Sequence, residues 1–347
     1  MYKNDRLTRL YSEPFKFNNL SELSRGKYTK SQLGKLYAIN PTTINEWIRF
    51  KNKKSTKIYI LMQIIIEKVE DWAAEKIKEN KPIYGGDIAQ SHVLIFESGR
   101  KCFLKSGAYN DRMFPTEANS LFELSRSNTI RVPRVLMAEP KFLLIEYIEP
   151  GRKLSSFFEE FGRQFAQMHH FTANHFGLFE DNFIGHTSQQ NIPQGNQATN
   201  WTKFYFEKRL LFQFKLAESR GLSSSFLNNA FKLLENKIES ILKTDDALPV
   251  LLHGDLWSGN YLADENGNPV LIDPAVYYGH READLAMTKV FGGFSSSFYS
   301  AYDETFPLAD GYEYRENIYK LYHILNHLNL FGMSYHQQAV SLLQRYL

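Results

Sequence analysis

The most constraining feature of this chain is a polar segment, His253–Asn260, whose sequence is His-Gly-Asp-Leu-Trp-Ser-Gly-Asn. Short apolar runs flank it, Val250–Leu252 before and Tyr261–Ala263 after, and each has the composition of a short strand. The turn-forming stretch Asp264–Asn268 then leads to a third short strand, Val270–Ile272. This arrangement predicts a rigid loop between strands, which presents an aspartate and an asparagine five residues apart.

An aspartate followed five residues later by an asparagine has the spacing of a kinase catalytic loop. In such a loop the aspartate, here Asp255, accepts the proton of the attacking hydroxyl, and the asparagine, here Asn260, binds a metal ion. Asp273 ends the third strand and takes the place of the main Mg²⁺ ligand, because magnesium prefers oxygen donors. Alternatively, these residues only form turns and a strand cap, since Asp and Asn are common in turns. Their spacing, order and strand context together favour the catalytic interpretation.

Two regions of different character follow one another along the chain, the first mixing strands with helices and the second mainly helical. For the first, the periodicity predicts helices at Ile58–Asn80 and Glu117–Ser125 and strands at Val93–Phe96, Lys101–Lys105, Arg134–Met137 and Phe142–Tyr147. For the second, it predicts helices at Phe157–Phe171, Trp201–Arg220, Ser225–Leu242 and Glu316–Phe331. The predicted fold is α+β, two-lobed and protein-kinase-like. A nucleotide-binding lobe spans residues 56–149, a helical lobe with the catalytic loop and acceptor site spans 150–347, and the nucleotide lies between them.

The first lobe offers candidate phosphate-binding residues. Lys105 closes the predicted hairpin and Glu117 lies in the next helix, and a strand lysine paired with a helix glutamate directs a cation at the α- and β-phosphates. Single Lys and Glu residues are usually solvated, so this interpretation depends on the downstream loop. Gly85 and Gly86 precede the first strand of the hairpin and could let backbone N–H groups approach phosphate. A helix end followed by a turn explains the two glycines nearly as well.

Residues 1–55 differ from the rest and predict a small all-α N-terminal extension. A capping box at Thr29–Gln32 and the pair Asn40–Pro41 each begin a short helix, a pattern typical of a helix-turn-helix. The basic stretch Lys51–Thr56 serves as a linker. Two interpretations stay open for this segment: DNA binding through the second helix, and a helical docking element on the following lobe.

The overall composition excludes several classes of protein. The net charge of +3 is mild, so any nucleic-acid binding has to be local to one segment. The single cysteine, Cys102, excludes a disulfide framework and a cysteine-based zinc site within one chain. The N-terminus lacks the apolar stretch of a signal peptide, and the run Ile58–Ile66 is too short to cross a bilayer. We therefore expect a cytoplasmic protein with no membrane partner.

At the level of these motifs, the sequence resembles the fructosamine kinase (ketosamine 3-kinase) family, a branch near the aminoglycoside phosphotransferases. The resemblance rests on His253–Asn260 and on Leu271–Ala286, whose sequence is Leu-Ile-Asp-Pro-Ala-Val-Tyr-Tyr-Gly-His-Arg-Glu-Ala-Asp-Leu-Ala. Further matching segments are Gly85–Ile88, Met113–Glu117, Ile130–Pro133, Asn182–Gly185, Trp201 with Phe204, and Leu325–His327 with Phe331–Gly332. The match extends from about residue 60 to the C-terminus.

The resemblance implies ATP-dependent phosphorylation of the 3-hydroxyl of a ketosamine, the Amadori product of a sugar and an amine. The 3-phosphate is prone to eliminate, which frees the amine, so the implied cellular role is deglycation. The acceptor is a fructosamine or ribulosamine, either free or protein-bound. In this comparison Asp255 is the base, Asn260 and Asp273 bind Mg²⁺, and Lys105 with Glu117 positions the phosphates of ATP.

The resemblance also implies roles for residues around these five. Glu146, Tyr147 and Ile148 form the hinge that faces adenine. Trp257 is either the floor beneath the sugar, because an aromatic face packs against its C–H surface, or a buried core residue that anchors the loop. His253 is structural and bonds the backbone near the metal-binding aspartate.

Outside the site, His280, Arg281 and Asp284 brace the activation segment. Some relatives carry a redox-active cysteine in the glycine loop. Here Cys102 lies on the following strand, so we do not expect that regulation.

Two other functions compete with this interpretation. Within enzymes, the acceptor could be another amino-sugar, an aminoglycoside or a choline-like alcohol. Outside enzymes, the chain could be a DNA-binding regulator whose kinase lobe senses a metabolite. The intact set Asp255, Asn260, Asp273 and Lys105 argues against an inactive kinase.

Overall fold

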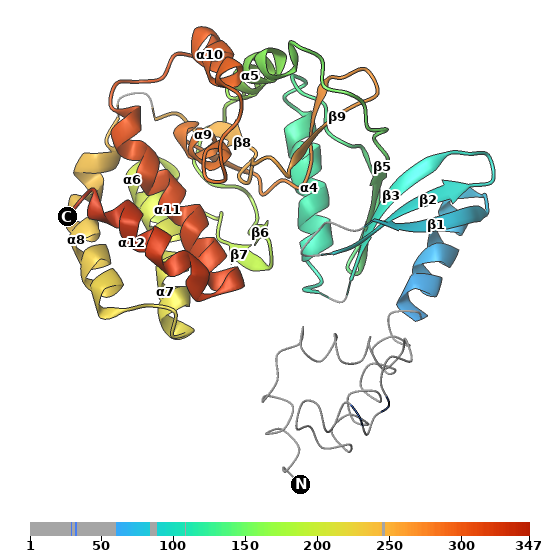
Figure 1. The fold of residues 1–347 in the computed structure, drawn as a ribbon, viewed down its shortest axis with the longest axis horizontal. Helices are drawn as coiled ribbons and strands as arrows, with labels where there is room; N and C mark the ends of the chain where they lie inside the picture. Colours follow the sequence, from blue (N-terminus) through green and yellow to red (C-terminus); the bar gives the residue numbers. More distant parts are fainter. Residues whose placement is uncertain (1–28, 30–31, 33–59, 84–88, 108, 245–246) are drawn as a thin grey trace. The chain divides into compact units, whose positions relative to one another are not determined.

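The computed structural model describes residues 29, 32, 60–83, 89–107, 109–244 and 247–347 (Figure 1). The chain divides into two compact units, Met1–Ile77 and Lys78–Leu347. Among the described helices, none combines the length and the apolar character needed to cross a membrane. The boundaries predicted at residues 55/56 and 149/150 stay predictions.

The predicted helix-turn-helix of residues 1–55 lies outside the described residues, apart from Thr29 and Gln32, and so do Gly85 and Gly86. The backbone N–H of Thr29 donates to Gln32 Oε1 at 2.7 Å, and the N–H of Gln32 donates to Thr29 Oγ1 at 3.3 Å. These reciprocal bonds confirm the predicted capping box.

A helix over residues 60–73 is the main described element of the first unit. Ile65 and Val69 are buried on one of its faces, in agreement with the predicted periodicity. The prediction that this helix continues to Asn80 is wrong, because the chain forms strand β1 (Ile77–Ile83) there instead.

Local backbone geometry explains where this helix ends. Ala74 has a left-handed φ of 53°, and the N–H of Glu75 donates to the carbonyl of Glu70 at 3.2 Å, as at many helix C-termini. The carboxylate of Glu70 then accepts the N–H of Ile77 at 2.9 Å. This side-chain bond fixes the first residue of β1.

A five-stranded sheet with the order β1-β2-β3-β5-β4 begins the second unit. The strands after β1 are β2 (Gln90–Phe96), β3 (Lys101–Ser106), β4 (Val135–Glu139) and β5 (Phe142–Glu146). Helix α4 (Met113–Ser125) packs against β4 and β5 (Figure 1). The predicted hairpin is confirmed, because β2 and β3 are antiparallel and the turn between them contains Gly99 with a φ of 86°. The predicted helix and the two later strands are also confirmed, with shifted ends.

The rest of the second unit is mainly helical. Its helices are α5 (Phe157–Met168), the 3-10 turn η1 (Gly195–Ala198), α6 (Trp201–Tyr205), the π-helical turn η2 (Phe206–Leu211), α7 (Phe212–Ser219), α8 (Ser225–Leu242), α9 (Glu282–Thr288), α10 (Ser296–Thr305), α11 (Tyr312–Phe331), the 3-10 turn η3 (Met333–Tyr335) and α12 (His336–Gln344). Three two-stranded sheets accompany them: β6 (Asn182–Ile184) with β7 (Thr187–Gln189), β8 (Val250–Leu252) with β11 (Tyr277–Gly279), and β9 (Tyr261–Ala263) with β10 (Pro269–Leu271).

The four helices and three strands predicted for this part are confirmed, with Trp201–Arg220 divided by the π-helical turn. The sequence analysis missed β6, β7, β11, α9, α10 and α12. Strands of three residues are too short for an alternating pattern to stand out, so their pairing depends on the tertiary fold.

A core of aromatic side chains joins helices α5 and α10 to strand β9, which directly follows the segment His253–Asn260. Phe161 and Phe165 of α5 lie 5.1 and 5.9 Å, between ring centroids, from Phe298 of α10. Gly162 permits this close approach, because an added Cβ would lie 2.2 Å from the carbonyl oxygen of Phe298. The ring of Phe161 also lies 5.1 Å from Tyr261, so the same core holds strand β9.

Candidate active site

The loop His253–Asn260 connects β8 to β9, and a buried carboxylate fixes its start. Asp284 of α9 accepts the backbone N–H groups of His253 at 2.6 Å and of Gly254 at 2.8 Å. Gly254 has a φ of 82°, and an added Cβ would lie 2.0 Å from the carbonyl oxygen of Ala275. The loop therefore requires glycine at this position.

His253 has the structural role that the sequence predicted. Its Nδ1 accepts the backbone N–H of Asp255 at 3.2 Å, so the ring proton lies on Nε2, which donates to the carbonyl of Ile272 at 3.0 Å. Burial lowers the pKa of His253, and the ring stays neutral near neutral pH. The predicted contact with the backbone near Asp273 is confirmed.

Asp255 and Asn260 face each other across the loop. The side-chain amide of Asn260 donates to the carbonyl oxygen of Asp255 at 2.7 Å and to its carboxylate Oδ2 at 3.2 Å. Burial raises the pKa of Asp255 well above its ordinary value, the charge of Asp273 adds to this, and the bond from Asn260 opposes it. A carboxylate in this environment has a strong affinity for a proton, which suits a general base.

Lys105, Glu117 and Asp273 form a second cluster. The ammonium of Lys105 lies 2.5 Å from Glu117 Oε1 and 2.5 Å from Asp273 Oδ1, and its side chain is only 9% exposed. Burial lowers the pKa of Lys105, but the two carboxylates outweigh it and raise the pKa overall, so the lysine stays charged. The predicted pairing of Lys105 with Glu117 is confirmed, and the structure adds Asp273 to it.

Asp273 is held in an unusual backbone conformation. Its φ of 56° lies in the left-handed region, which few residues other than glycine adopt. Two buried amides hold the segment that follows, since Asn182 donates to the carbonyl of Val276 at 2.8 Å and Gln189 donates to that of Ala275 at 2.9 Å. Sequence analysis assigned no role to these amides, because they lie more than eighty residues from their partners in the chain.

The predicted hinge, Glu146–Ile148, begins at the last residue of strand β5. Ile148 is buried, and the ammonium of Lys101 lies 5.3 Å from the ring centroid of Tyr147. The carboxylate of Glu146 points to two arginines, pairing with Arg131 at 2.9 Å and with Arg134 Nε at 3.3 Å. The Glu146 side chain is therefore already engaged by these arginines, which leaves the backbone of Glu146 for an adenine contact.

Trp257 lies on the surface of the catalytic loop. Its side chain is 37% exposed, so it is not a buried core residue. Its ring lies 5.7 Å from Phe291, which lies 4.8 Å from His327, and His327 lies 5.4 Å from Phe331. We call Trp257, Phe291, His327 and Phe331 the aromatic surface. Sequence analysis assigned a role only to the first of these, because rings give no signal of which distant rings they contact.

Of the residues expected to brace the activation segment, Asp284 holds the catalytic loop itself, as described above. Arg281 donates to the carbonyls of Phe306 at 2.6 Å and Pro307 at 2.5 Å, and its guanidinium lies 3.7 Å from the Phe306 ring centroid. His280 Nδ1 lies 3.7 Å from Glu282. Arg281 thus fixes the start of α9, which carries Asp284.

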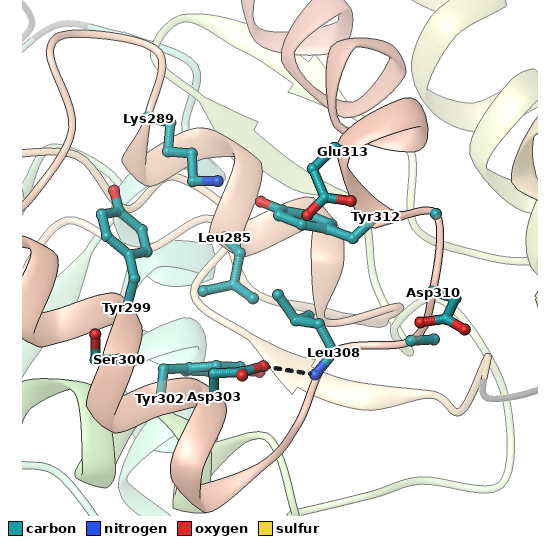
Figure 2. Close-up of a pocket in the computed structure, with 12 residues that line it drawn as sticks. Leu285, Lys289, Tyr299, Ser300, Tyr302, Asp303, Leu308, Asp310, Tyr312 and Glu313 are labelled. Carbon is teal, nitrogen blue, oxygen red and sulfur yellow. Dashed lines mark hydrogen bonds between the residues drawn. The ribbon is translucent and has the colours of Figure 1, made fainter.

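A cavity of about 460 Å³ lies among α9, α10 and the start of α11 (Figure 2). The ammonium of Lys289 lies 5.2 Å from the ring centroid of Tyr299 and 4.7 Å from that of Tyr312, and it pairs with Glu316 at 2.6 Å. No described residue of the predicted site lines this cavity. The cavity is therefore separate from the candidate active site.

The sequence of this chain is similar to those of several known proteins. A sequence model of fructosamine kinases matches residues 60–347. A probable ketoamine kinase of Synechocystis is 39% identical over 277 residues, covering 78% of this chain and 90% of that protein. A chloroplastic protein-ribulosamine 3-kinase of Arabidopsis thaliana is 40% identical over 242 residues, covering 68% of this chain and 72% of that protein.

Solved structures with a similar fold also exist. The crystal structure of a fructosamine-3-kinase candidate from Thermobifida fusca matches with a TM-score of 0.74 and 28% identity, over 81% of this chain and 98% of that chain. An ADP-bound aminoglycoside phosphotransferase matches with a TM-score of 0.55 and 15% identity, over 81% and 96% of the two chains, which shows similarity of fold alone. The predicted α+β, two-lobed kinase-like fold is confirmed.

Proposed function

Because this chain belongs to the fructosamine kinase family, we propose that it phosphorylates the 3-hydroxyl of a ketosamine of fructosamine or ribulosamine type. The protein is an ATP-dependent kinase with an alcohol group as acceptor. One observation carries the proposal: the side chains of Asp255, Asn260, Asp273, Lys105 and Glu117 form two adjoining clusters in the arrangement that phosphoryl transfer needs.

Asp255 acts on the acceptor. Its carboxylate accepts the proton of the 3-hydroxyl while the hydroxyl oxygen forms a bond to the γ-phosphorus. The bond between this phosphorus and the bridging oxygen of ATP breaks, and ADP leaves. The hydrogen bonds from Asn260 keep the carboxylate in one orientation, so the base is positioned before the acceptor binds.

Lys105 acts on the nucleotide. Its charge is maintained by Glu117 and Asp273, and its buried position fixes the direction of the ammonium. We assign it the α- and β-phosphates of ATP, with the hinge backbone at Glu146–Ile148 facing the adenine. Gly85 and Gly86 lie outside the described residues, so their contribution to phosphate binding stays a prediction.

Asn260 and Asp273 would hold Mg²⁺. The amide nitrogen of Asn260 faces Asp255, so its oxygen is the atom available as a ligand, and Asp273 adds a carboxylate. No group of three His, Cys, Asp or Glu side chains in the described residues could hold a metal ion. The two oxygen donors nevertheless fit Mg²⁺, which takes one or two protein ligands together with phosphates and water. When bound, the metal neutralises charge on the β- and γ-phosphate oxygens.

The aromatic surface beside the catalytic loop would bind the acceptor. Trp257 is exposed next to Asp255, and an aromatic face packs well against the C–H groups of a sugar. Phosphorylation at the 3-position would then lead to elimination of the phosphate and release of the amine, which is deglycation. The family match begins at residue 60, so no comparison supports DNA binding by residues 1–55.

An acceptor panel tests this proposal. ADP formation is measured with fructosyl and ribulosyl amines, free and peptide-bound, and with aminoglycosides, amino-sugars and choline. The proposal predicts turnover with the ketosamines at least about tenfold above every other acceptor in kcat/KM. Turnover with an aminoglycoside or choline but with no ketosamine would contradict it.

A further inference from the structure

Arg131 lies in the segment that connects α4 to β4. Its backbone runs parallel to Val270 of β10, and its carbonyl accepts the N–H of Leu271 at 3.0 Å. The backbone of this segment is therefore attached to the strand that leads to Asp273. No role in the reaction follows from this contact alone.

The side chain of Arg131 adds a second connection. Its Nη2 donates to Glu146 Oε1 at 2.9 Å, and its Nη1 donates to Asp264 Oδ2 at 2.8 Å and to Glu265 Oε2 at 3.4 Å. The side chain of Asp264 is only 4% exposed and that of Glu146 is 21% exposed, so these pairs are better shielded from water than an ordinary surface pair.

Both carboxylates are held in the ionised form. Although burial opposes ionisation, hydrogen bonds from Arg131 and Arg134 lower the pKa of Glu146. For Asp264, burial is likewise outweighed, by the backbone N–H of Asn268 and by Arg131. The guanidinium thus remains bound to two charged partners around neutral pH.

These partners belong to two different parts of the site. Glu146 is the last residue of β5, where the hinge begins. Asp264 directly follows β9, and its Oδ1 accepts the N–H groups of Asn266 and Asn268, which shape the turn to β10. Asn260 directly precedes the hairpin β9–β10, and Asp273 follows its end with only Ile272 between them. Arg131 therefore connects the turn of this hairpin to the hinge, because it binds both Asp264 and Glu146.

We propose that Arg131 is a positioning residue that sets the distance between the hinge and the hairpin carrying Asn260 and Asp273. It touches neither the nucleotide nor the acceptor in this proposal, which rests on the proposed function. A nucleotide whose adenine lies on the hinge and whose phosphates lie at Asn260 and Asp273 requires this spacing. Arg131 therefore matters when both ends of the nucleotide are bound, and not when only the adenine is.

Arg134 provides a matched control. It donates to the same carboxylate of Glu146, at 3.3 Å, but its side chain is 79% exposed and no bond from it to Asp264 is formed. The substitution Arg134→Gln removes one cation beside Glu146 and leaves the connection to the hairpin. Asp264→Asn is a second test variant, because the amide keeps an oxygen for the turn and loses the anionic partner of Arg131.

The experiment is a calorimetric titration of ADP into the full-length protein, once with Mg²⁺ and once with a chelator. Wild type is expected to bind ADP more tightly with Mg²⁺. The ratio of the Kd for ADP without Mg²⁺ to the Kd with Mg²⁺ measures this strengthening. In Arg131→Gln and Asp264→Asn the ratio should fall by about tenfold or more, as when other residues that orient metal ligands are changed. Binding without Mg²⁺ should change less than about twofold, and Arg134→Gln should resemble wild type.

A full Mg²⁺-dependent strengthening in folded Arg131→Gln and Asp264→Asn would overturn the proposal. An equal loss in Arg134→Gln would also overturn it, since the effect would then come from charge near Glu146. If Arg131→Gln does not fold, Asp264→Asn decides the question by itself. Absence of ADP binding by wild type would overturn the proposed function itself. ADP binding by wild type together with a full Mg²⁺ effect in the two variants would overturn the positioning role alone, so the two failures can be told apart.

Discussion

Lys105 and Asp273 are 168 residues apart in the chain, yet the ammonium of one lies 2.5 Å from the carboxylate of the other. Glu117 Oε1 also lies 2.5 Å from the same ammonium. The sheet, helix α4 and the segment after β10 therefore meet at one buried cation. Because the reaction needs a cation at the phosphates and a carboxylate at the metal, this contact joins the two halves of the site.

Replacing Lys105 tests that contact. Lys105→Met should lower kcat/KM for ATP by about 100-fold or more, because a charge at the phosphates is lost and the carboxylates of Glu117 and Asp273 lose their partner. Steady-state kinetics at varied ATP give the measurement. Lys101→Met is the control, since Lys101 lies on the same strand in an exposed pair with Glu149 and should stay within about twofold. Equal effects of the two substitutions would contradict the assignment.

Asp255→Asn should lower the activity of the protein and raise its thermal stability. Loss of the base should lower kcat by about 10²- to 10⁴-fold while ADP still binds. In a chelating buffer at neutral pH, the variant should melt at a higher temperature than wild type. Burial raises the pKa of Asp255, so its ionised form costs stability above that pKa, and the asparagine removes the cost.

The gain in melting temperature should disappear near about pH 3, where the carboxyl group is protonated in both the folded and unfolded states. Asp111→Asn changes an exposed carboxylate paired with Lys141, and it should alter neither property. Turnover of folded Asp255→Asn close to that of wild type would show that another group is the base.

Gly254→Ala should remove activity through backbone geometry alone. An added Cβ would lie 2.0 Å from the carbonyl oxygen of Ala275, so the loop has to move away from the segment after Asp273. Gly99→Ala is the matched control, since Gly99 has a similar φ of 86° but open space around it. Both variants should lose about 1–2 kcal/mol from the left-handed backbone. Only Gly254→Ala should lose turnover, and normal turnover in that variant would contradict the close contact.

His323 predicts a pH dependence of stability. Burial, with the charge of nearby His327, lowers the pKa of His323 to about 3, whereas an unfolded chain has a value near about 6.5. Between these values the unfolded state binds more protons, so the free energy of unfolding should fall as the pH falls, by up to about 1.4 kcal/mol per pH unit. His323→Gln should show a shallower decrease than wild type in denaturant titrations from neutral to acidic pH. An unchanged slope would exclude His323 as the titrating group.

The candidate catalytic residues were predictable because their signal is local. Asp255 and Asn260 share one loop, and Asp273 comes shortly after the next hairpin. Lys105 lies on a hairpin strand and Glu117 lies in a helix, and both elements have a clear periodicity. The supports of the site were not predictable in the same way. Arg131 reaches Asp264 across 133 residues, and no pattern in the sequence marks which carboxylate an arginine will bind.

Strand β1 shows a second limit of sequence analysis. Ile77 continues the apolar spacing of the preceding helix, and the prediction therefore extended the helix over residues 77–80. The left-handed φ at Ala74 and the bond from Ile77 to Glu70 end the helix before them. A single alanine in that conformation has no sequence signature, because left-handed residues are usually glycine or asparagine.

The position of the transferred phosphate tests the central claim most directly. Wild type is incubated with ATP and fructosyl-lysine labelled with ¹³C at C3, and the product is observed by ¹³C and ³¹P NMR. The account predicts one phosphate on the labelled carbon, seen as carbon–phosphorus coupling, for each ADP formed, and no product with Asp255→Asn. A phosphate on another carbon, or ADP formed without any sugar phosphate, would contradict it.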